Sequence, residues 1–310
     1  MSGQNTLYLV ATPIGHRDDI GLRAIEVLRT VSRVFAEDTR RSLPLLRHHG
    51  IPTPVEALHE HNEAARAERI AARLAGGEGG DVALVSDAGT PLVSDPGYRL
   101  VRACIGAGVE VRVVPGPCAL VAALAVSGLP TDRFEFVGFP PSRSGARREW
   151  LGALGSRAHT LVLYESPHRI EATLGDVVHA FGDERPVALA RELTKRFETV
   201  LRGTAAEVLE RVATDPDQRR GEFAVVIGGK PARGARAAGR AGSAVGAGGE
   251  AGLGPDGDAE ASAGAVVELD RLIVALAAHL PPKAVAKLAQ ELLGVSRRAA
   301  YDRAVALASR

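Results

Sequence analysis

Short apolar runs alternate with longer amphipathic stretches along the first 117 residues. The runs at 7–10, 82–85 and 111–114 have the length and composition of buried strands, whereas 20–30 and 98–107 have the apolar spacing of helices. Strands that alternate with helices in this way predict βαβ units and a mostly parallel sheet. We therefore expect residues 1–117 to form an N-terminal α/β domain.

A second set of apolar runs follows. ProGlyPro opens a predicted helix at 118–127 that connects the two parts, and helical stretches separate the later runs. Strands are expected at 134–138, 160–164, 187–191, 199–202 and 223–227. Residues 118–230 should thus form a second α/β domain, and the predicted fold class is α/β.

The composition changes after Gly228. Gly and Ala dominate residues 231–264 without sustained apolar periodicity, which predicts a flexible linker. Helical spacing returns in residues 265–310, with helices expected at 266–279, 283–293 and 296–307. The last two resemble a helix-turn-helix unit that could turn Arg297, Arg298 and Tyr301 toward nucleic acid. A tail that docks RNA or supports a dimer is an equal alternative.

Polar motifs follow several of the predicted strands. SerAspAlaGlyThrPro at 86–91 comes after one strand, and the others are followed by ThrProIleGly at 12–15, ProGlyProCysAla at 115–119, TyrGluSerProHisArg at 164–169 and ArgGluLeuThrLys at 191–195. Open α/β sheets bind ligands at the carboxyl ends of their strands, so these motifs predict one crevice and an enzyme. The alternative for the first loop is an ordinary turn in which Asp95 caps the next helix.

Together with AlaGluAspThrArg at 36–40 and HisGluHisAsnGlu at 59–63, the order of these motifs resembles the ribosomal RNA small subunit methyltransferase I family of the tetrapyrrole methylase superfamily. The resemblance covers roughly residues 6–229, with a weaker match at 280–307. It implies two α/β domains with S-adenosylmethionine in the cleft between them, and a homodimer. It further implies methylation of a cytidine 2′-hydroxyl in small-subunit (16S) rRNA near the decoding centre. His16 and Arg17 depart from the Asn-Leu usual in the family.

The resemblance also implies which residues contact the cofactor: Pro13, Gly15, Asp87, Ala88, Gly89, Thr90, Pro115, Gly116, Cys118, Ala119, Tyr164 and Ala190. Glycine-rich backbone together with carboxylates suits a cationic sulfonium better than it suits a phosphate. In-line displacement at a sulfonium methyl needs no metal. His59 and His61 have no third ligand nearby in the sequence, so no metal site is predicted.

A ribose hydroxyl needs a proton acceptor and a nearby cation to react as a nucleophile. Glu192 is a candidate acceptor, with Arg191 or Lys195 as the cation. Asp38 and Arg40 are candidates for similar roles, and Glu165 is a further carboxylate at a strand end. The alternative for each pair is a structural salt bridge.

The net charge gives no overall basicity, because 38 Lys and Arg residues face 37 Asp and Glu residues. Any RNA-binding surface must therefore be local. Arg143, Arg147 and Arg148 follow ProPro at 140–141 and could form a basic loop at the rim of the crevice. The alternative is a solvated helix start.

The two cysteines, Cys104 and Cys118, form no CxxC pair, and no apolar run is long enough for a membrane span. We expect a cytoplasmic protein without a membrane partner, whose partners are small-subunit rRNA or the 30S particle and a second copy of the chain. The alternatives are a small-molecule (tetrapyrrole-type) methyltransferase of the same fold and a nucleic-acid-binding regulator that uses the C-terminal helices. The tail and the basic loop favour the rRNA methyltransferase.

Overall fold

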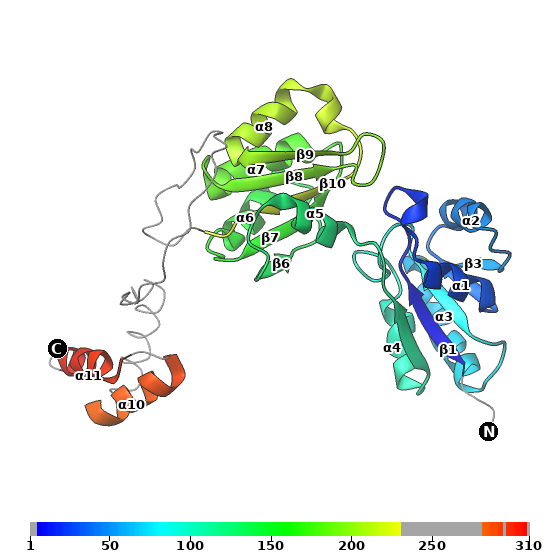
Figure 1. Cartoon of the computed structure of the whole chain (residues 1–310), viewed down its shortest axis with the longest axis horizontal. Helices are drawn as coiled ribbons and strands as arrows, with labels where there is room; N and C mark the ends of the chain where they lie inside the picture. Colours follow the sequence, from blue (N-terminus) through cyan, green and yellow to red (C-terminus); the bar gives the residue numbers. More distant parts are fainter. Residues whose placement is uncertain (1–4, 231–280, 294–295, 309–310) are drawn as a thin grey trace, which may run out of the picture. The chain divides into compact units, whose positions relative to one another are not determined.

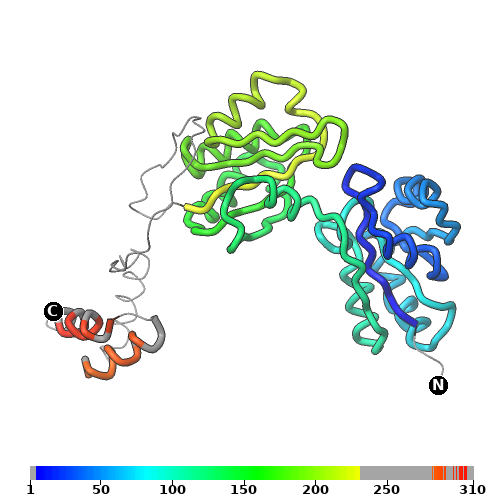
Figure 2. The backbone as a smooth tube through the Cα atoms, viewed as in Figure 1, coloured from blue at the N-terminus to red at the C-terminus, as the bar shows by residue number. Residues whose placement is uncertain are grey.

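A computed structural model describes residues 5–230, 281–293 and 296–308 (Figures 1 and 2). The chain divides into two compact units, Met1–Lys230 and Pro231–Arg310. The first unit contains two five-stranded sheets, and Figure 2 shows a single segment of chain passing from one to the other. This segment lies between residues 114 and 119. The two predicted sets of strands therefore correspond to two separate sheets.

The first sheet is entirely parallel, with the order β3-β2-β4-β1-β5. Its strands are β1 (Thr6–Val10), β2 (Arg33–Ala36), β3 (Val55–Ala57), β4 (Val82–Val85) and β5 (Glu110–Val114). The prediction of a mostly parallel sheet is confirmed. All five carboxyl ends consequently lie at one edge of this sheet.

Helices cover both faces of this sheet. Helices α1 (Leu22–Thr30) and α2 (Thr39–His48) pack on one face, and α3 (Glu60–Ala75) and α4 (Tyr98–Gly106) pack on the other (Figure 1). Neighbouring residues of β4 therefore belong to opposite cores: Leu84 packs with α3 and α4, and Val85 with α1 and α2. Burial on both faces explains why this strand is a continuous apolar run. A short 3-10 helix, η1 (Arg17–Asp19), precedes α1.

The second sheet is mixed, with the order β6-β7-β10-β8-β9. Its strands are β6 (Phe134–Phe136), β7 (Thr160–Glu165), β8 (Pro186–Arg191), β9 (Thr199–Thr204) and β10 (Phe223–Ile227). Strand β10 is antiparallel to both β7 and β8, so these two strands run in the same direction. Their carboxyl ends, and the motifs that follow them, lie at the same edge although the sheet is not parallel.

Four helices pack on the second sheet. Helices α6 (Ser144–Leu154), α7 (Ile170–Phe181) and α8 (Ala205–Thr214) cover one face, and η2 (Pro216–Arg219) follows α8. Helix α5 (Ala119–Ser127) covers the other face with Leu120 and Leu124. Gly128 ends α5 in the left-handed conformation with φ +74°, which a glycine adopts without strain. The predicted helix at 118–127 is thus confirmed.

The second unit contains α10 (Pro282–Leu293) and α11 (Arg297–Ala308). They pack through Val285 and Ala286 of α10 and Ala300 and Ala304 of α11, which confirms the two expected short helices. The predicted linker at 231–264 and helix at 266–279 lie outside the described residues. Among the residues that are described, no helix combines the length and apolar character needed to cross a membrane.

Candidate active site

A cavity of about 440 Å³ lies where loops from both sheets meet. This volume falls within the range of about 300–1,000 Å³ typical of small-molecule sites. The cavity is lined by Ile14, Glu37, Arg41, Asp87, Ala88, Gly89, Thr90, Val93, Ser94, Asp95, Cys118, Ala119, Phe139, Tyr164, Glu165, Ser166, Pro167, Ala190, Leu193, Lys195, Glu222, Phe223 and Ala224. The predicted convergence of the strand-end motifs on one crevice is confirmed.

Backbone hydrogen bonds fasten the loops of the first sheet to one another. Thr12 and Gly89 exchange two bonds, with N···O distances of 2.9 and 3.0 Å. Thr90 donates its hydroxyl to the carbonyl of Pro117 at 3.1 Å. Gly89 has φ +88°, a conformation that strains other residues. The loops after β1, β4 and β5 therefore form one rigid wall of the cavity.

Tyr164 stands at the end of β7 on the opposite wall. Its hydroxyl oxygen accepts a hydrogen bond of 2.9 Å from the N–H of Leu120, one of the free donors at the start of α5. Burial raises the pKa of Tyr164 to about 12, so its hydroxyl is neutral at physiological pH. The rings of Phe136 and Phe139 lie 4.9 and 5.7 Å from the Tyr164 ring, and Phe139 is half exposed.

Most of the expected cofactor residues line the cavity: Asp87, Ala88, Gly89, Thr90, Cys118, Ala119, Tyr164 and Ala190. Pro13, Gly15, Pro115 and Gly116 are not among the lining residues. A Cβ at Gly15 would lie 2.9 Å from the carbonyl oxygen of Leu193, and one at Gly116 would lie 3.0 Å from Cβ of Ala11. Both glycines thus permit close packing of neighbouring chain segments.

Lys195 reaches the cavity between two carboxylates. Its Nζ lies 2.8 Å from both Glu192 and Glu222. Burial works against the charge of Lys195, but these two hydrogen bonds outweigh it and raise the pKa, so the amine stays protonated. Burial also opposes the charge of Glu192 and would raise its pKa. Hydrogen bonds from Lys195 and from the N–H of Glu222 outweigh this effect and lower the pKa. Glu192 does not line the cavity and is a weakened base.

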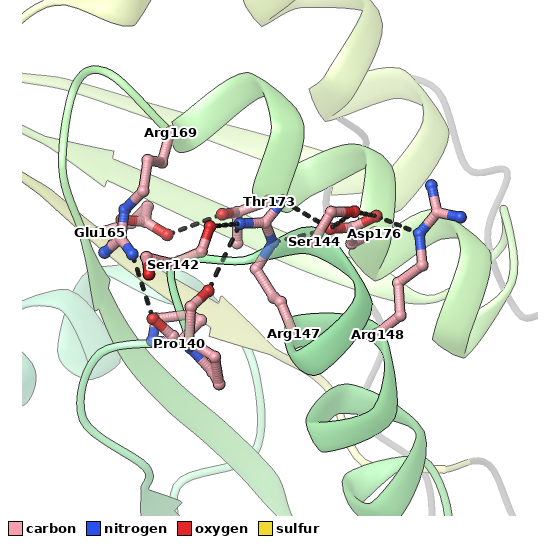
Figure 3. Close-up of polar contacts among 10 residues, drawn as sticks. Pro140, Ser142, Ser144, Arg147, Arg148, Glu165, Arg169, Thr173 and Asp176 are labelled. Atoms are coloured by element: carbon pink, nitrogen blue, oxygen red, sulfur yellow. Dashed lines mark hydrogen bonds and ion pairs between the residues drawn. The ribbon is translucent and has the colours of Figure 1, made fainter.

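Arg191 and Glu165 make buried contacts that shape the loops. Arg191 donates to the carbonyls of Arg220 at 2.6 Å and Phe197 at 2.8 Å, and it does not line the cavity. The covered carboxylate of Glu165 forms an ion pair with Arg169 and accepts a hydrogen bond from the Thr173 hydroxyl, each at 2.7 Å (Figure 3). These bonds stabilise the turn from β7 into α7.

Asp38 and Arg40 lie at a second hollow of about 460 Å³, which shares Glu37, Arg41 and Asp87 with the main cavity. Asp38 caps α2 by accepting the N–H of Arg40 at 2.9 Å, and it forms an ion pair of 2.7 Å with the Arg40 side chain. These hydrogen bonds lower the pKa of Asp38 to about 2. The pair lies beside the main cavity and does not line it.

Asp95 is a cavity residue that the sequence analysis did not select. The alternative in which Asp95 caps α4 is wrong, because Gly97 is the N-cap and no side chain caps this helix. Burial raises the pKa of Asp95 to about 7, and the negative charge of Glu37 adds to this effect. Burial also raises the pKa of Glu37. Asp95 lies within the SerAspProGly segment that follows β4. This polar motif at a strand end could have indicated from the sequence that Asp95 is a site residue.

The expectation of an exposed basic loop is wrong for Arg147. Its side chain is 4% exposed and forms an ion pair of 2.7 Å with Asp176, whose side chain is 3% exposed (Figure 3). Arg148 also binds Asp176, at 2.6 Å, while its side chain remains 53% exposed. The two arginines join α6 to α7, and Arg143 is the exposed N-cap of α6.

His59 is the N-cap of α3, and the rings of His59 and His61 lie 5.9 Å apart. Within the described ranges, Asp18, His48 and His49 offer ligand atoms that lie within 4.8 Å of one another. Asp18 and His48 are exposed, and Nε2 of His48 lies 3.5 Å from Oδ1 of Asp18. The expectation that this protein uses no metal ion stays a prediction.

Comparisons with known proteins agree with this geometry. The family model of Tetrapyrrole (Corrin/Porphyrin) Methylases matches residues 6–209, and that of the RsmI C-terminal HTH domain matches residues 263–308. A protein of Xylella fastidiosa named ribosomal RNA small subunit methyltransferase I is 47% identical over 97% of this chain and 99% of its own length. This chain belongs to the ribosomal RNA small subunit methyltransferase I family. Its tetrapyrrole methylase domain makes it an S-adenosylmethionine-dependent methyltransferase.

Two further members of the methyltransferase I family show the same full-length likeness. Proteins with the same name from Pseudomonas aeruginosa and Escherichia coli O157:H7 are 46% and 42% identical, over 97% and 98% of this chain and 96% of each relative. The solved cobalt precorrin-4 methyltransferase aligns with a TM-score of 0.56 at 18% identity, over 74% of this chain and 96% of that one. This structural likeness confirms the tetrapyrrole methylase fold.

Proposed function

We propose that this chain transfers the methyl group of S-adenosylmethionine to the ribose 2′-hydroxyl of a cytidine in small-subunit rRNA. The full-length similarity to proteins named ribosomal RNA small subunit methyltransferase I is the observation that carries the proposal. The substrate chemistry comes from the motif resemblance. The match of residues 263–308 to the RsmI C-terminal HTH domain supports it further.

The residues of the main cavity fit the cofactor. When bound, S-adenosylmethionine supplies an electrophilic methyl group on a cationic sulfonium. Asp87 and Asp95 provide carboxylates in a cavity of suitable volume, and Gly89 exposes backbone in a conformation that permits close approach. In this proposal Ala88, Thr90, Cys118, Ala119, Tyr164 and Ala190 contact the cofactor directly, while Pro13, Gly15, Pro115 and Gly116 hold the loops that form the cavity wall.

Lys195 is proposed as the cation that steadies the acceptor. Its charge is maintained by Glu192 and Glu222, and it lines the cavity. A fixed cation beside a reacting hydroxyl favours the developing negative charge on oxygen. In this proposal Glu192 orients Lys195. Arg191 and Glu165 maintain the loops, and Asp38 and Arg40 flank the entrance for RNA.

We further propose a division of labour along the chain. Residues 1–117 and 118–230 act as two α/β domains that enclose the cofactor, residues 231–264 as a linker, and residues 265–310 as an RNA-docking unit. The proposed substrate is rRNA within the 30S particle, the proposed location is the cytoplasm, and the active form is a homodimer. Exposed Arg298 and Tyr301 on α11 support an RNA contact by the last unit.

The decisive experiment measures transfer of labelled methyl from S-adenosylmethionine to unmodified 30S subunits, and in parallel to naked rRNA. Nuclease digestion then identifies the labelled nucleoside, which we expect to be 2′-O-methylcytidine. Label on another nucleoside, or none despite cofactor binding, would contradict the proposal. Sedimentation of the active fraction tests the homodimer.

Ala88→Trp tests the cofactor site, because Ala88 is exposed and lines the cavity, so that an indole fills space needed by the ligand. We expect calorimetry to give a Kd for S-adenosylmethionine that is at least tenfold higher for Ala88→Trp than for the wild type. Ala107→Trp is the matched control, since Ala107 is exposed at the end of α4 and does not line the cavity. Equal affinities of the two variants would place the cofactor elsewhere.

A further inference from the structure

Five carboxylates line the main cavity within the described part of the chain: Glu37, Asp87, Asp95, Glu165 and Glu222. Three of them are already engaged by strong donors. Glu165 binds Arg169 and Thr173, Asp87 accepts the N–H of Asp38 at 3.0 Å and pairs with Arg41 at 3.4 Å, and Glu222 binds Lys195. Donors of the protein itself therefore already occupy these three carboxylates.

Glu37 and Asp95 differ from these three because no salt bridge joins either of them to a cation across the described ranges of the chain. The positive charge of Arg41 acts against the rise in the pKa of Glu37, and the pKa of Asp95 has no such opposing cation. The surroundings of Asp95 are the Ser86 hydroxyl, the carboxylates of Glu37 and Asp87, and Tyr164 across the cavity. Arg41 faces this group through its pair with Asp87, and Lys195 and Glu222 line the same cavity.

The segment that carries Asp95 is held on both sides. Val93 packs against the apolar cluster of the second sheet, and Gly97 adopts φ +128° where an added Cβ would meet Leu84 and Leu92. Asp95 is therefore presented to the cavity from a fixed loop. A general base requires such positioning before its proton affinity matters.

We propose that Asp95 is the proton acceptor for the hydroxyl group that is methylated in this cavity. The inference rests on the proposed function. The 2′-oxygen forms a bond to the methyl carbon while the carbon–sulfur bond breaks, and the bonding pair returns to sulfur to give a neutral thioether. The hydroxyl proton passes to the Asp95 carboxylate, which becomes a carboxylic acid and later releases the proton to water.

The electrostatics of the cavity favour Asp95 over Glu192 in this role. With its pKa raised to about 7, Asp95 is partly ionised at neutral pH and accepts a proton more strongly than an ordinary aspartate. The pKa of Glu192 is instead lowered by its donors, and Glu192 does not line the cavity. Glu37 contributes negative charge that increases the proton affinity of Asp95.

The test is a pH profile of methyl transfer in single turnovers, with the full-length enzyme in excess over unmodified 30S subunits and saturated with labelled S-adenosylmethionine. We expect the wild-type rate to rise with pH and level off after one inflection, which should lie at or below about pH 7 because the bound sulfonium cation lowers the pKa of a nearby carboxylate. Asp95→Asn should lower the rate about 100-fold or more, as expected for loss of a general base, and abolish this inflection. Asp217→Asn is the matched control, because Asp217 is exposed on η2 and pairs with exposed Arg220.

Glu37→Gln separates a proton acceptor from a structural residue. Removing the negative charge of Glu37 should lower the pKa of Asp95 and move the inflection to lower pH, while methyl transfer persists. Asp95→Glu should retain an inflection. A wild-type profile without an inflection between about pH 5 and 8, an Asp95→Asn rate within fivefold of wild type, or loss of the inflection in Glu37→Gln would each overturn the proposal.

Folding and cofactor binding are measured on every variant. Because the folded pKa of Asp95 lies above its unfolded value, ionisation at pH 8 opposes folding, so Asp95→Asn should have a Tm at pH 8 no lower than wild type. The wild-type profile tests the proposal even if one variant fails to fold. If the wild type binds S-adenosylmethionine but labels no cytidine, the proposed function fails first, and the inference about Asp95 fails with it.

Discussion

At the scale of single residues, the surroundings of a charged side chain determine its role. Arg147 and Arg148 are neighbours in the sequence, yet Arg147 is enclosed by α6 and α7 whereas Arg148 is half exposed. Their shared partner Asp176 also accepts a hydrogen bond from Ser144 at 3.2 Å (Figure 3). A buried guanidinium without its counter-charge is costly, so Asp176 is needed to keep Arg147 in its buried position.

Asp176→Asn should destabilise the protein by about 3 kcal/mol, because it leaves the Arg147 charge buried without a counter-charge. The midpoint and slope of urea unfolding at pH 7 measure this effect. Arg148→Ala, which removes a half-exposed partner, should cost under about 1 kcal/mol. Equal losses of unfolding free energy for the two variants would show that burial does not distinguish these two ion pairs.

At the scale of elements, glycine allows the loop after β4 to enter α4. Gly97 has φ +128°, and a Cβ there would lie 2.6 Å from Cδ2 of Leu84 in the core. The same loop carries Asp95 and the Thr90 hydroxyl that binds Pro117. The start of α4 and the wall of the cavity are thus built together.

Gly97→Ala should destabilise the protein by about 1–3 kcal/mol, through backbone strain and the clash with Leu84. Thermal unfolding measures the change. Gly106→Ala at the other end of α4 meets nothing within 4 Å and should leave Tm unchanged or raise it slightly. A loss at Gly106 equal to that at Gly97 would contradict the assigned cause.

At the scale of the whole molecule, cofactor chemistry and RNA docking are expected to belong to different units. Residues that line the main cavity all lie in Met1–Lys230. Arg298 and Tyr301 lie exposed on α11. Because the net charge is +1, attraction to RNA must come from such local groups.

A chain that ends at Lys230 should bind S-adenosylmethionine with the affinity of the full chain and bind 30S subunits at least tenfold more weakly. Calorimetry and filter binding measure the two affinities. In the full chain, Arg298→Glu should weaken RNA binding and reduce its salt dependence without changing cofactor affinity. RNA affinity that survives both changes would assign docking to the first unit.

Local patterns in the sequence predicted eight of the ten strands in the described part of the chain and the edge at which the polar motifs gather. They also predicted the helices α1, α4, α5, α10 and α11, whereas β2 and β3 were not predicted. Apolar runs and their Gly and Pro boundaries depend on local periodicity, which is why 82–85 and 223–227 match β4 and β10. The order of motifs also determined the family, because each motif is a local string.

Only the tertiary structure shows which charges are buried, and that the cavity carboxylates Glu37 and Asp95 have no salt bridge within the described ranges. Arg147 and Asp176 stand 29 positions apart, and Glu37 and Asp95 come from different strand ends, so no local pattern predicts their meeting. The antiparallel insertion of β10 between β7 and β8 was also not visible in the sequence. Burial and long-range pairing depend on how distant segments pack, and packing sets the pKa values on which the chemistry depends.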